Sequence, residues 1–168
     1  MGSARDEEFQ DFVRRRRPAL LKIATAMTGG DRHLAEDVVQ VCVTKLYLAW
    51  PRIRPVELDG YARRVLVNAL IDEKRDVFRR REQVWADVPD RPQSTERDGD
   101  RYDLLKALGH MPPRMRAAVV LRHVEGLSIE ETADALRCST GTVKSQTARG
   151  LTRLRELVGD PDRTYSGT

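Results

Sequence analysis

The chain has 168 residues, with 30 Lys and Arg against 26 Asp and Glu, and an isoelectric point near 9.3. Its apolar runs fall short of the roughly 18 residues that a membrane span needs, and its N-terminus lacks the apolar core of a secretion signal, so we expect a cytoplasmic protein. The length suits one domain or two small ones, and the basic balance is typical of proteins that bind nucleic acid.

The first half of the chain carries helical periodicity. Apolar residues between positions 9 and 27 predict one helix, which a pair of glycines ends. Asp31 can cap a second helix that runs until Pro51. A third apolar stripe begins at Tyr61 and continues into a strongly basic run. We therefore predict a helical first module over residues 6–81.

The pattern fails between residues 82 and 103. This stretch holds two prolines, no sustained period, and seven acids against three bases. We predict a flexible acidic linker here. Its acids are either solvated or imitate a nucleic-acid backbone against the basic modules.

Helical signals return over residues 104–158, the predicted second module, which leaves 159–168 as a tail. Pro113 suits a first helical turn. Ser128 and Ser139 can each cap a short helix, and only a few residues separate the two helices. Two helices joined so tightly cross steeply and form a helix-turn-helix. The predicted fold is therefore all-α, with two small helical domains.

The outward face of the second of these helices suits a DNA groove. Short hydroxyls let a helix approach base edges, while Lys and Arg reach phosphates or guanine acceptors. A solvated basic helix would show the same periodicity, so that alternative stays open. The candidate DNA-binding residues are Thr142, Lys144, Ser145, Arg149 and Arg153.

Two other classes of function remain to be compared. The first is a dimeric helix-turn-helix transcriptional repressor, with residues 1–81 as a dimerisation or ligand domain. The second is an enzyme, which the isolated histidines and the absence of a phosphate-binding glycine loop disfavour.

Cys42 and Cys138 lie far apart and lack metal-ligand spacing, so we expect both to be reduced, buried, small apolar residues. We expect no cofactor and no metal.

The two modules together resemble one known family. The motif LAEDVVQ at residues 34–40, the stretch YARRVLVNALIDEKR at 61–75 and the long block at 107–155 that contains GTVKSQ are similar to regions 2 and 4 of extracytoplasmic-function (group 4) sigma factors of bacterial RNA polymerase, most closely the actinobacterial SigE-like subset. The resemblance implies a sigma factor that binds core polymerase and recognises the −35 and −10 promoter elements. It also implies nucleoid association in the holoenzyme, and it allows an anti-sigma factor as a further partner.

The resemblance also implies roles for individual residues. Asn68 matches the position that opens the loop capturing a flipped base of the −10 element. For the second module, the resemblance implies a contact with the beta flap of the polymerase. The positions that match the contact with the beta-prime clamp helices are Glu36, Asp37 and Gln40. The candidates for contacts to the opened −10 strand are Arg63, Arg64, Lys74, Arg75, Arg79 and Arg80.

Some positions depart from the family's pattern, among them Tyr61, the stretch VCVTKLYLAW and Arg137. Arg137 stands in the turn between the two short helices, where relatives commonly have Gly. The turn must therefore either avoid a positive φ or be strained.

Overall fold

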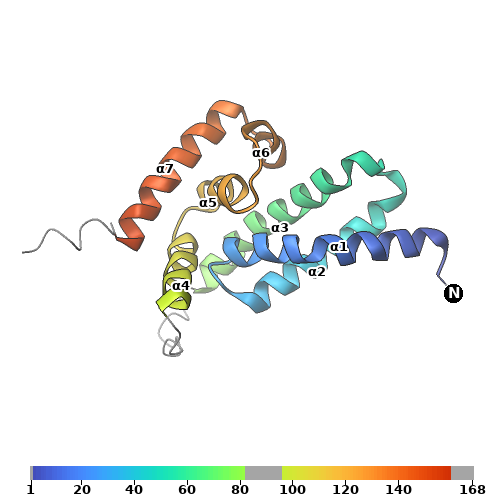
Figure 1. The fold of residues 1–168 in the computed structure, drawn as a ribbon, viewed down its shortest axis with the longest axis horizontal. Helices are drawn as coiled ribbons and strands as arrows, with labels where there is room; N and C mark the ends of the chain where they lie inside the picture. The colour runs from blue at the N-terminus through green and yellow to red at the C-terminus, as the bar shows by residue number, and fades with distance from the viewer. Residues whose placement is uncertain (1, 82–95, 160–168) are drawn as a thin grey trace, which may run out of the picture.

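The computed structural model describes residues 2–81 and 96–159, and for residues 73–81, 96–98 and 102 it describes the backbone only. All regular secondary structure in the described parts of the chain is helical, with no strand among them (Figure 1). The all-α prediction is confirmed. Most of the predicted linker, residues 82–95, and most of the predicted tail lie outside the described residues.

The first module is built from three helices. They are α1 (Ala4–Met27), α2 (Arg32–Ala49) and α3 (Leu58–Arg81), with short 3-10 turns at Trp50–Arg52 and Pro55–Glu57 between the last two. The predicted cap at Asp31 is confirmed, since its side chain accepts a hydrogen bond of 3.1 Å from the backbone N–H of Leu34. Ser3 begins α1 with a reciprocal capping box to Asp6.

Apolar side chains from all three helices fill the core of this module. Ile23 of α1, Leu46 of α2 and Leu66 of α3 are fully buried. At the far end of α1, the ring of Phe9 meets the Trp50 ring edge-on with 5.2 Å between centroids. This packing fixes α2 and α3 against α1, so that the outer face of α2 stays at the surface.

The second module contains four α-helices and one π-helical turn. They are α4 (Glu96–Gly109), α5 (Pro113–Val119), the π turn η3 (Val120–Val124), α6 (Ile129–Leu136) and α7 (Thr140–Val158). The predicted linker extended to Asp103, but α4 begins at Glu96, so the module starts eight residues earlier than Leu104. Glu96 and Asp98 are the acids that the positive end of a helix dipole favours.

The two modules pack against each other and share one core. In Figure 1, α3 runs diagonally below α5 and α6, with both of which it is in contact, and α1 passes close to α4. Buried Met27 and Leu70 of the first module belong to the same apolar cluster as Leu121 and Leu136 of the second. The sequence predicts two modules, and the structure joins them into a single body.

Candidate nucleic-acid and polymerase interfaces

Helix α7 lies on the outside of the second module. Ser139 caps its start by accepting a hydrogen bond of 3.1 Å from the N–H of Thr142. Val143 and Gly150 are buried against the module. A Cβ on Gly150 would come within 2.4 Å of Val119 in α5, so glycine lets these helices approach closely. The buried side of α7 thereby sets which face points outward.

The candidate DNA-binding residues all lie on that outward face. Arg153 forms only a local ion pair of 3.4 Å with Glu156, and both side chains are largely exposed. Exposed pairs of this kind contribute about 1 kcal/mol or less, so the guanidinium can readily turn to a phosphate. The predicted residues that the structure leaves exposed are Thr142, Lys144, Ser145, Arg149 and Arg153.

The turn before α7 contains a non-glycine residue with a positive φ, which is the strained one of the two expected conformations. Arg137 has φ 52° and ψ 50°, and among the non-glycine residues that the structure describes it alone has a positive φ. The N–H of Cys138 donates to the carbonyl of Ala133 at 3.1 Å, which closes the end of α6. A left-handed residue other than Gly costs about 1–2 kcal/mol, so the tight crossing of α6 and α7 is maintained at that cost.

The outer face of α2 carries the predicted polymerase-contacting residues. Glu36, Asp37 and Gln40 are all exposed, while Val39 and Cys42 between and beyond them point into the core. The same exposed face continues into apolar side chains that sequence reasoning missed. Val41 is 46% exposed and Leu48 is 68% exposed, which marks a mixed polar and apolar surface along the helix.

The structure corrects the placement of Asn68. This residue lies inside α3, eleven residues into a helix that continues to Arg81, and is half-buried. Asn68 therefore neither opens a loop nor caps a helix end. The surrounding sequence favours this outcome, because Leu, Ala, Glu, Lys and Arg around it are strong helix formers and an interior Asn costs less than about 1 kcal/mol. Lys74, Arg75, Arg79 and Arg80 lie further along α3, with side chains outside the described residues.

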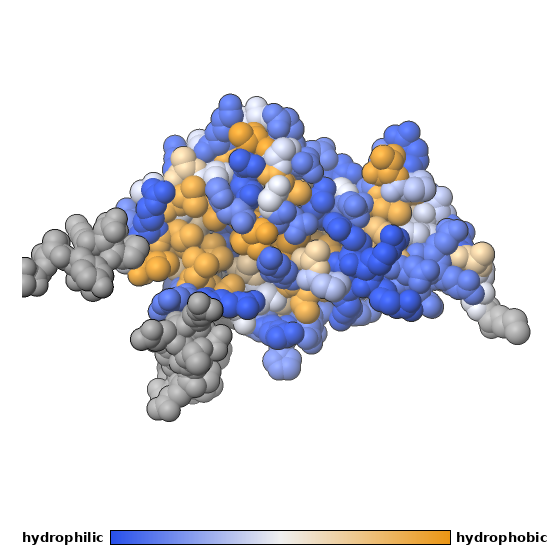
Figure 2. Space-filling view, in the orientation of Figure 1, coloured by the Kyte–Doolittle hydropathy of each residue, from blue (hydrophilic) through white to orange (hydrophobic). Residues whose placement is uncertain are grey.

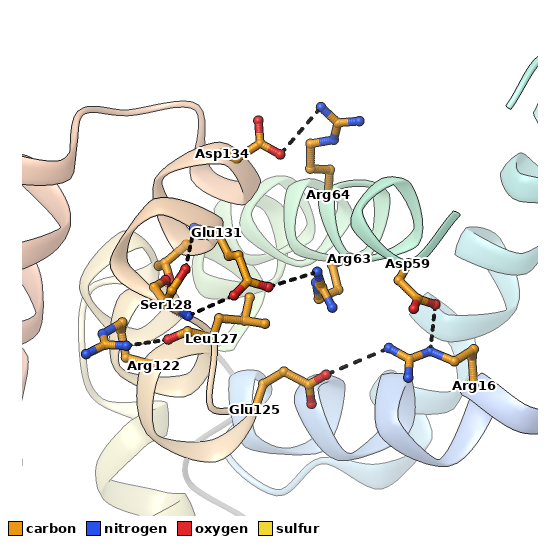
Figure 3. Close-up of polar contacts among 11 residues, drawn as sticks. Arg16, Asp59, Arg63, Arg64, Arg122, Glu125, Leu127, Ser128, Glu131 and Asp134 are labelled. Atoms are coloured by element: carbon orange, nitrogen blue, oxygen red, sulfur yellow. Dashed lines mark hydrogen bonds and ion pairs between the residues drawn. The ribbon is translucent and has the colours of Figure 1, made fainter. Parts of the chain in front are cut away.

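The two remaining arginines of the predicted −10 face are engaged across the modules (Figure 3). Arg63 lies 3.7 Å from a carboxylate oxygen of Glu131, and Arg64 lies 3.9 Å from one of Asp134. Their side chains are 15% and 34% exposed, so α6 covers much of both. No local signal in the sequence predicts these pairs, because the partners lie about seventy positions apart.

Glu131 is held in place on its own helix as well. The backbone N–H of Ser128 donates to its carboxylate at 3.2 Å, and its own N–H donates to the Ser128 hydroxyl at 3.0 Å. These hydrogen bonds, with a smaller contribution from Arg63, lower the pKa of Glu131 below its usual value. Glu131 therefore remains ionised at neutral pH and continues to attract the guanidinium of Arg63.

The two cysteines differ in environment. Cys42 is fully buried, its thiol contacts the Ala62 carbonyl at 3.6 Å, and burial raises its pKa to about 11. Cys138 is only partly buried, so the expectation of two buried cysteines is right for one of them. Within residues 2–81 and 96–159, no group of three or more His, Cys, Asp or Glu could hold a metal ion, and no helix is long and apolar enough to cross a membrane.

Two family models match the chain, one for each module. Residues 12–81 match "Sigma-70 region 2" and residues 101–154 match "Sigma-70, region 4". The RNA polymerase sigma-E factor of Streptomyces coelicolor is 40% identical over 153 residues, which cover 89% of this chain and 85% of that protein. The ECF RNA polymerase sigma factor SigE of Mycolicibacterium smegmatis is 30% identical over 89% of this chain and 61% of its own length.

Two solved structures share the fold across both modules. The sigma factor RpoE of Bartonella quintana, crystallised with the anti-sigma factor NepR, has a TM-score of 0.71 and 24% identity, and the match covers 92% of this chain and 99% of that one. CnrH in complex with the cytosolic domain of CnrY has a TM-score of 0.67 and 21% identity over 91% of this chain and 88% of its own. The helical arrangement in Figure 1 is thus one that known proteins adopt.

Proposed function

Because the chain belongs to the sigma-70 family and its relatives are RNA polymerase sigma factors, we propose that α2 docks it on core polymerase while α3 and α7 recognise the −10 and −35 promoter elements. The chain is a sigma factor that directs transcription initiation. The observation that supports these residue roles is the exposure of the predicted docking and −35 residues on two separate helices.

The alternative of a dimeric repressor is not supported. That reading needs residues 1–81 as a dimerisation or ligand domain, whereas residues 12–81 match a sigma region 2 model. Sigma factors are regulatory proteins, and we propose that this one has no catalytic chemistry, cofactor or metal of its own. Its place is then in the cytoplasm, on the nucleoid when it is bound to the core enzyme.

The proposed docking surface is the outer face of α2. Glu36, Asp37 and Gln40 would pair with basic and polar groups of the beta-prime clamp helices. Val41 and Leu48 are exposed on the same helix and would bury apolar area in that contact, at about 25 cal/mol for each Å² removed from water. A surface that combines a few charges with exposed apolar side chains is typical of protein–protein interfaces.

A second polymerase contact is proposed where α4 meets the end of α7. Leu104, Leu157 and Val158 are 41%, 38% and 47% exposed, and Figure 2 shows apolar surface over the region where these helices lie. We assign this surface to the beta flap. One solved neighbour, RpoE, is described in complex with the anti-sigma factor NepR, which supports the same class of partner for this chain.

The −10 assignment rests on α3. Helix α3 carries a run of basic residues of the kind that holds a single strand, namely Arg63 and Arg64, with Lys74, Arg75, Arg79 and Arg80 further along the sequence. Asn68 offers both a donor and an acceptor to a base edge. Because it lies within a helix, it would meet the base from the helix face rather than from a loop.

Core binding tests the proposed function. Fluorescently labelled chain is titrated with core polymerase from a Streptomyces species, the source of several relatives. Losing one partner of an interfacial charge pair costs about 2–5 kcal/mol, so the double variant Asp37→Ala, Gln40→Ala should bind at least about 30-fold more weakly. Glu8→Ala with Gln10→Ala, which removes an exposed carboxylate and an exposed amide from α1, should leave the affinity unchanged. Equal affinity of all three chains would refute docking through α2.

A further inference from the structure

A groove runs between α4 and the second half of α1, two helices that contact each other. Its volume is about 550 Å³, which lies within the range of roughly 300–1,000 Å³ that small-molecule sites occupy. Among the residues that the structure describes, its walls include no side chain assigned above to DNA or to the docking face of α2. The groove shares Leu104 with the surface assigned to the beta flap.

The walls of this groove are mostly apolar. Leu104 is 41% exposed, and Leu21 and Leu105 are only partly buried, so the packing of the helices leaves apolar surface open to water. The hydroxyl of Thr25 on the α1 wall donates to the carbonyl of Leu21 at 2.7 Å and needs no polar ligand. An apolar group that covers such walls is stabilised by the hydrophobic effect. The apolar wall residues are Pro18, Leu21, Leu104, Leu105, Leu108 and Val124.

Three exposed cations line the same groove, each from a different helix. They are Lys22 of α1, Arg32 of α2 and Arg101 of α4. Arg32 pairs with Glu36 on its own helix at 3.9 Å, and because both side chains are largely exposed, this pair contributes little and is easily exchanged for another. Within the described part of the chain, no Asp or Glu lines the groove. The charge of the walls therefore favours an anion.

The apolar walls and the cations together restrict the class of ligand. Inorganic phosphate would engage the cations but leave the leucines in water. An uncharged apolar molecule would cover the leucines but gain nothing from the positive potential. A bilayer surface is broad, whereas these leucines line a concave groove. The arrangement suits a single molecule with a long apolar chain and one anionic end.

We propose that this groove binds one long-chain fatty acid. The chain lies against the leucines of α1 and α4, and the carboxylate is held by the cations Lys22, Arg32 and Arg101. Pairs of carboxylate and guanidinium can be bidentate, so the two arginines fix the anionic end more firmly than point charges would. The inference goes beyond the proposed function and does not depend on it.

Ligand binding by the wild-type, full-length chain is the first test. The probe is cis-parinaric acid, a long-chain fatty acid whose fluorescence rises in apolar surroundings, and saturated fatty acids of increasing length, kept below their micelle concentrations, displace it. Each added methylene should tighten binding about two- to fourfold until the chain fills the groove, because full burial of one methylene gives about fourfold. Palmitate should bind at least about fourfold more tightly than hexadecanol, the uncharged alcohol of the same chain length.

Paired substitutions test where the ligand binds. Lys22→Gln with Arg101→Gln removes two of the lining cations and should weaken palmitate binding about 4- to 30-fold, the factor for losing two exposed charge pairs. The control, Arg15→Gln with Lys106→Gln, also removes one Arg and one Lys from α1 and α4, but from exposed positions outside the groove. It should bind palmitate as wild type does. All four positions are exposed, so both chains should fold, which circular dichroism checks.

Several results would overturn the proposal. They include probe binding that does not saturate, equal affinities for palmitate and hexadecanol, and equal palmitate affinities of the two double variants. Binding to phosphatidylglycerol vesicles that palmitate does not compete with would assign the groove to a membrane surface instead. A designed amphipathic peptide of Leu and Glu that displaces the probe while palmitate does not would assign it to a protein helix. Self-association in sedimentation velocity that Lys22→Gln with Arg101→Gln abolishes would assign it to a second copy of the chain.

Discussion

Replacement of Arg116 by Met should destabilise the whole molecule. Arg116 donates to three backbone carbonyls, those of Met27, Gly109 and Met111, across the seam between the modules. Hydrogen bonds to a charged group contribute about 1.5–3 kcal/mol each, which gives a gain of about 4.5–9 kcal/mol for the three. Methionine fills a similar volume and removes every donor.

The cost of burying the charge offsets part of this gain. Burial lowers the pKa of Arg116 well below its usual value, to about 10. A shift of that size corresponds to about 3 kcal/mol against the charged form, at about 1.4 kcal/mol for each pKa unit. The net stabilisation is therefore about 1.5–6 kcal/mol, and we expect Arg116→Met to lower the free energy of unfolding by about 3 kcal/mol.

Thermal unfolding followed by circular dichroism measures this effect. For a chain of this size, about 3 kcal/mol corresponds to a fall in Tm of about 6–12 °C. The control is Arg114→Met, which removes an exposed arginine from the same helix and should change Tm by no more than about 2 °C. If Arg116→Met unfolds within 2 °C of that control, the buried guanidinium does not hold the modules together and the reasoning fails.

Three further outcomes are expected. Asn68→Ala should reduce strand opening, read by permanganate reactivity at a promoter, more than it reduces closed-complex binding; equal losses in both steps would reduce Asn68 to a structural residue. Arg137→Gly should raise the free energy of unfolding by about 0.5–1 kcal/mol in urea titrations, because relief of the left-handed strain exceeds the entropy that Gly loses on folding. A destabilised Arg137→Gly variant would argue against that strain. At pH 8, iodoacetamide should label Cys138 before Cys42. A pKa of about 11 leaves the Cys42 thiol about 100-fold less ionised than an ordinary thiol, and burial shields it from the reagent as well. Faster labelling of Cys42 would contradict its burial.

Local features of the fold could be predicted from the sequence. The caps at Asp31, Ser128 and Ser139 are confirmed, because a cap depends on a side chain and an N–H two or three residues away. The outward face of α7 follows from the same helical periodicity that buries Val143. Caps and helical periodicity both depend on residues a few positions apart, so one short stretch of sequence is enough to predict them.

Features that depend on distant partners could not be predicted in this way. The ion pair of Arg64 with Asp134 joins residues that are seventy positions apart, and no periodicity connects them. The family resemblance predicts that Asn68 opens a loop, yet the helix-forming residues around it extend α3 past Asn68. The start of α4 at Glu96 could not be predicted, because the first turns of this helix are acidic and polar and have the composition of a linker. In each case local composition is compatible with more than one structure, and the tertiary packing or the extent of the helix decides.

Run-off transcription tests the central claim most directly. Purified full-length chain is added to core polymerase on a fragment library of the genome that encodes it, and the transcript starts are sequenced. We expect new start sites that share two upstream elements near −35 and −10, and that are lost with the double variant Asp37→Ala, Gln40→Ala. If core polymerase initiates at the same sites with and without the chain, although the chain binds the core enzyme, the chain does not direct promoter recognition and the account is contradicted.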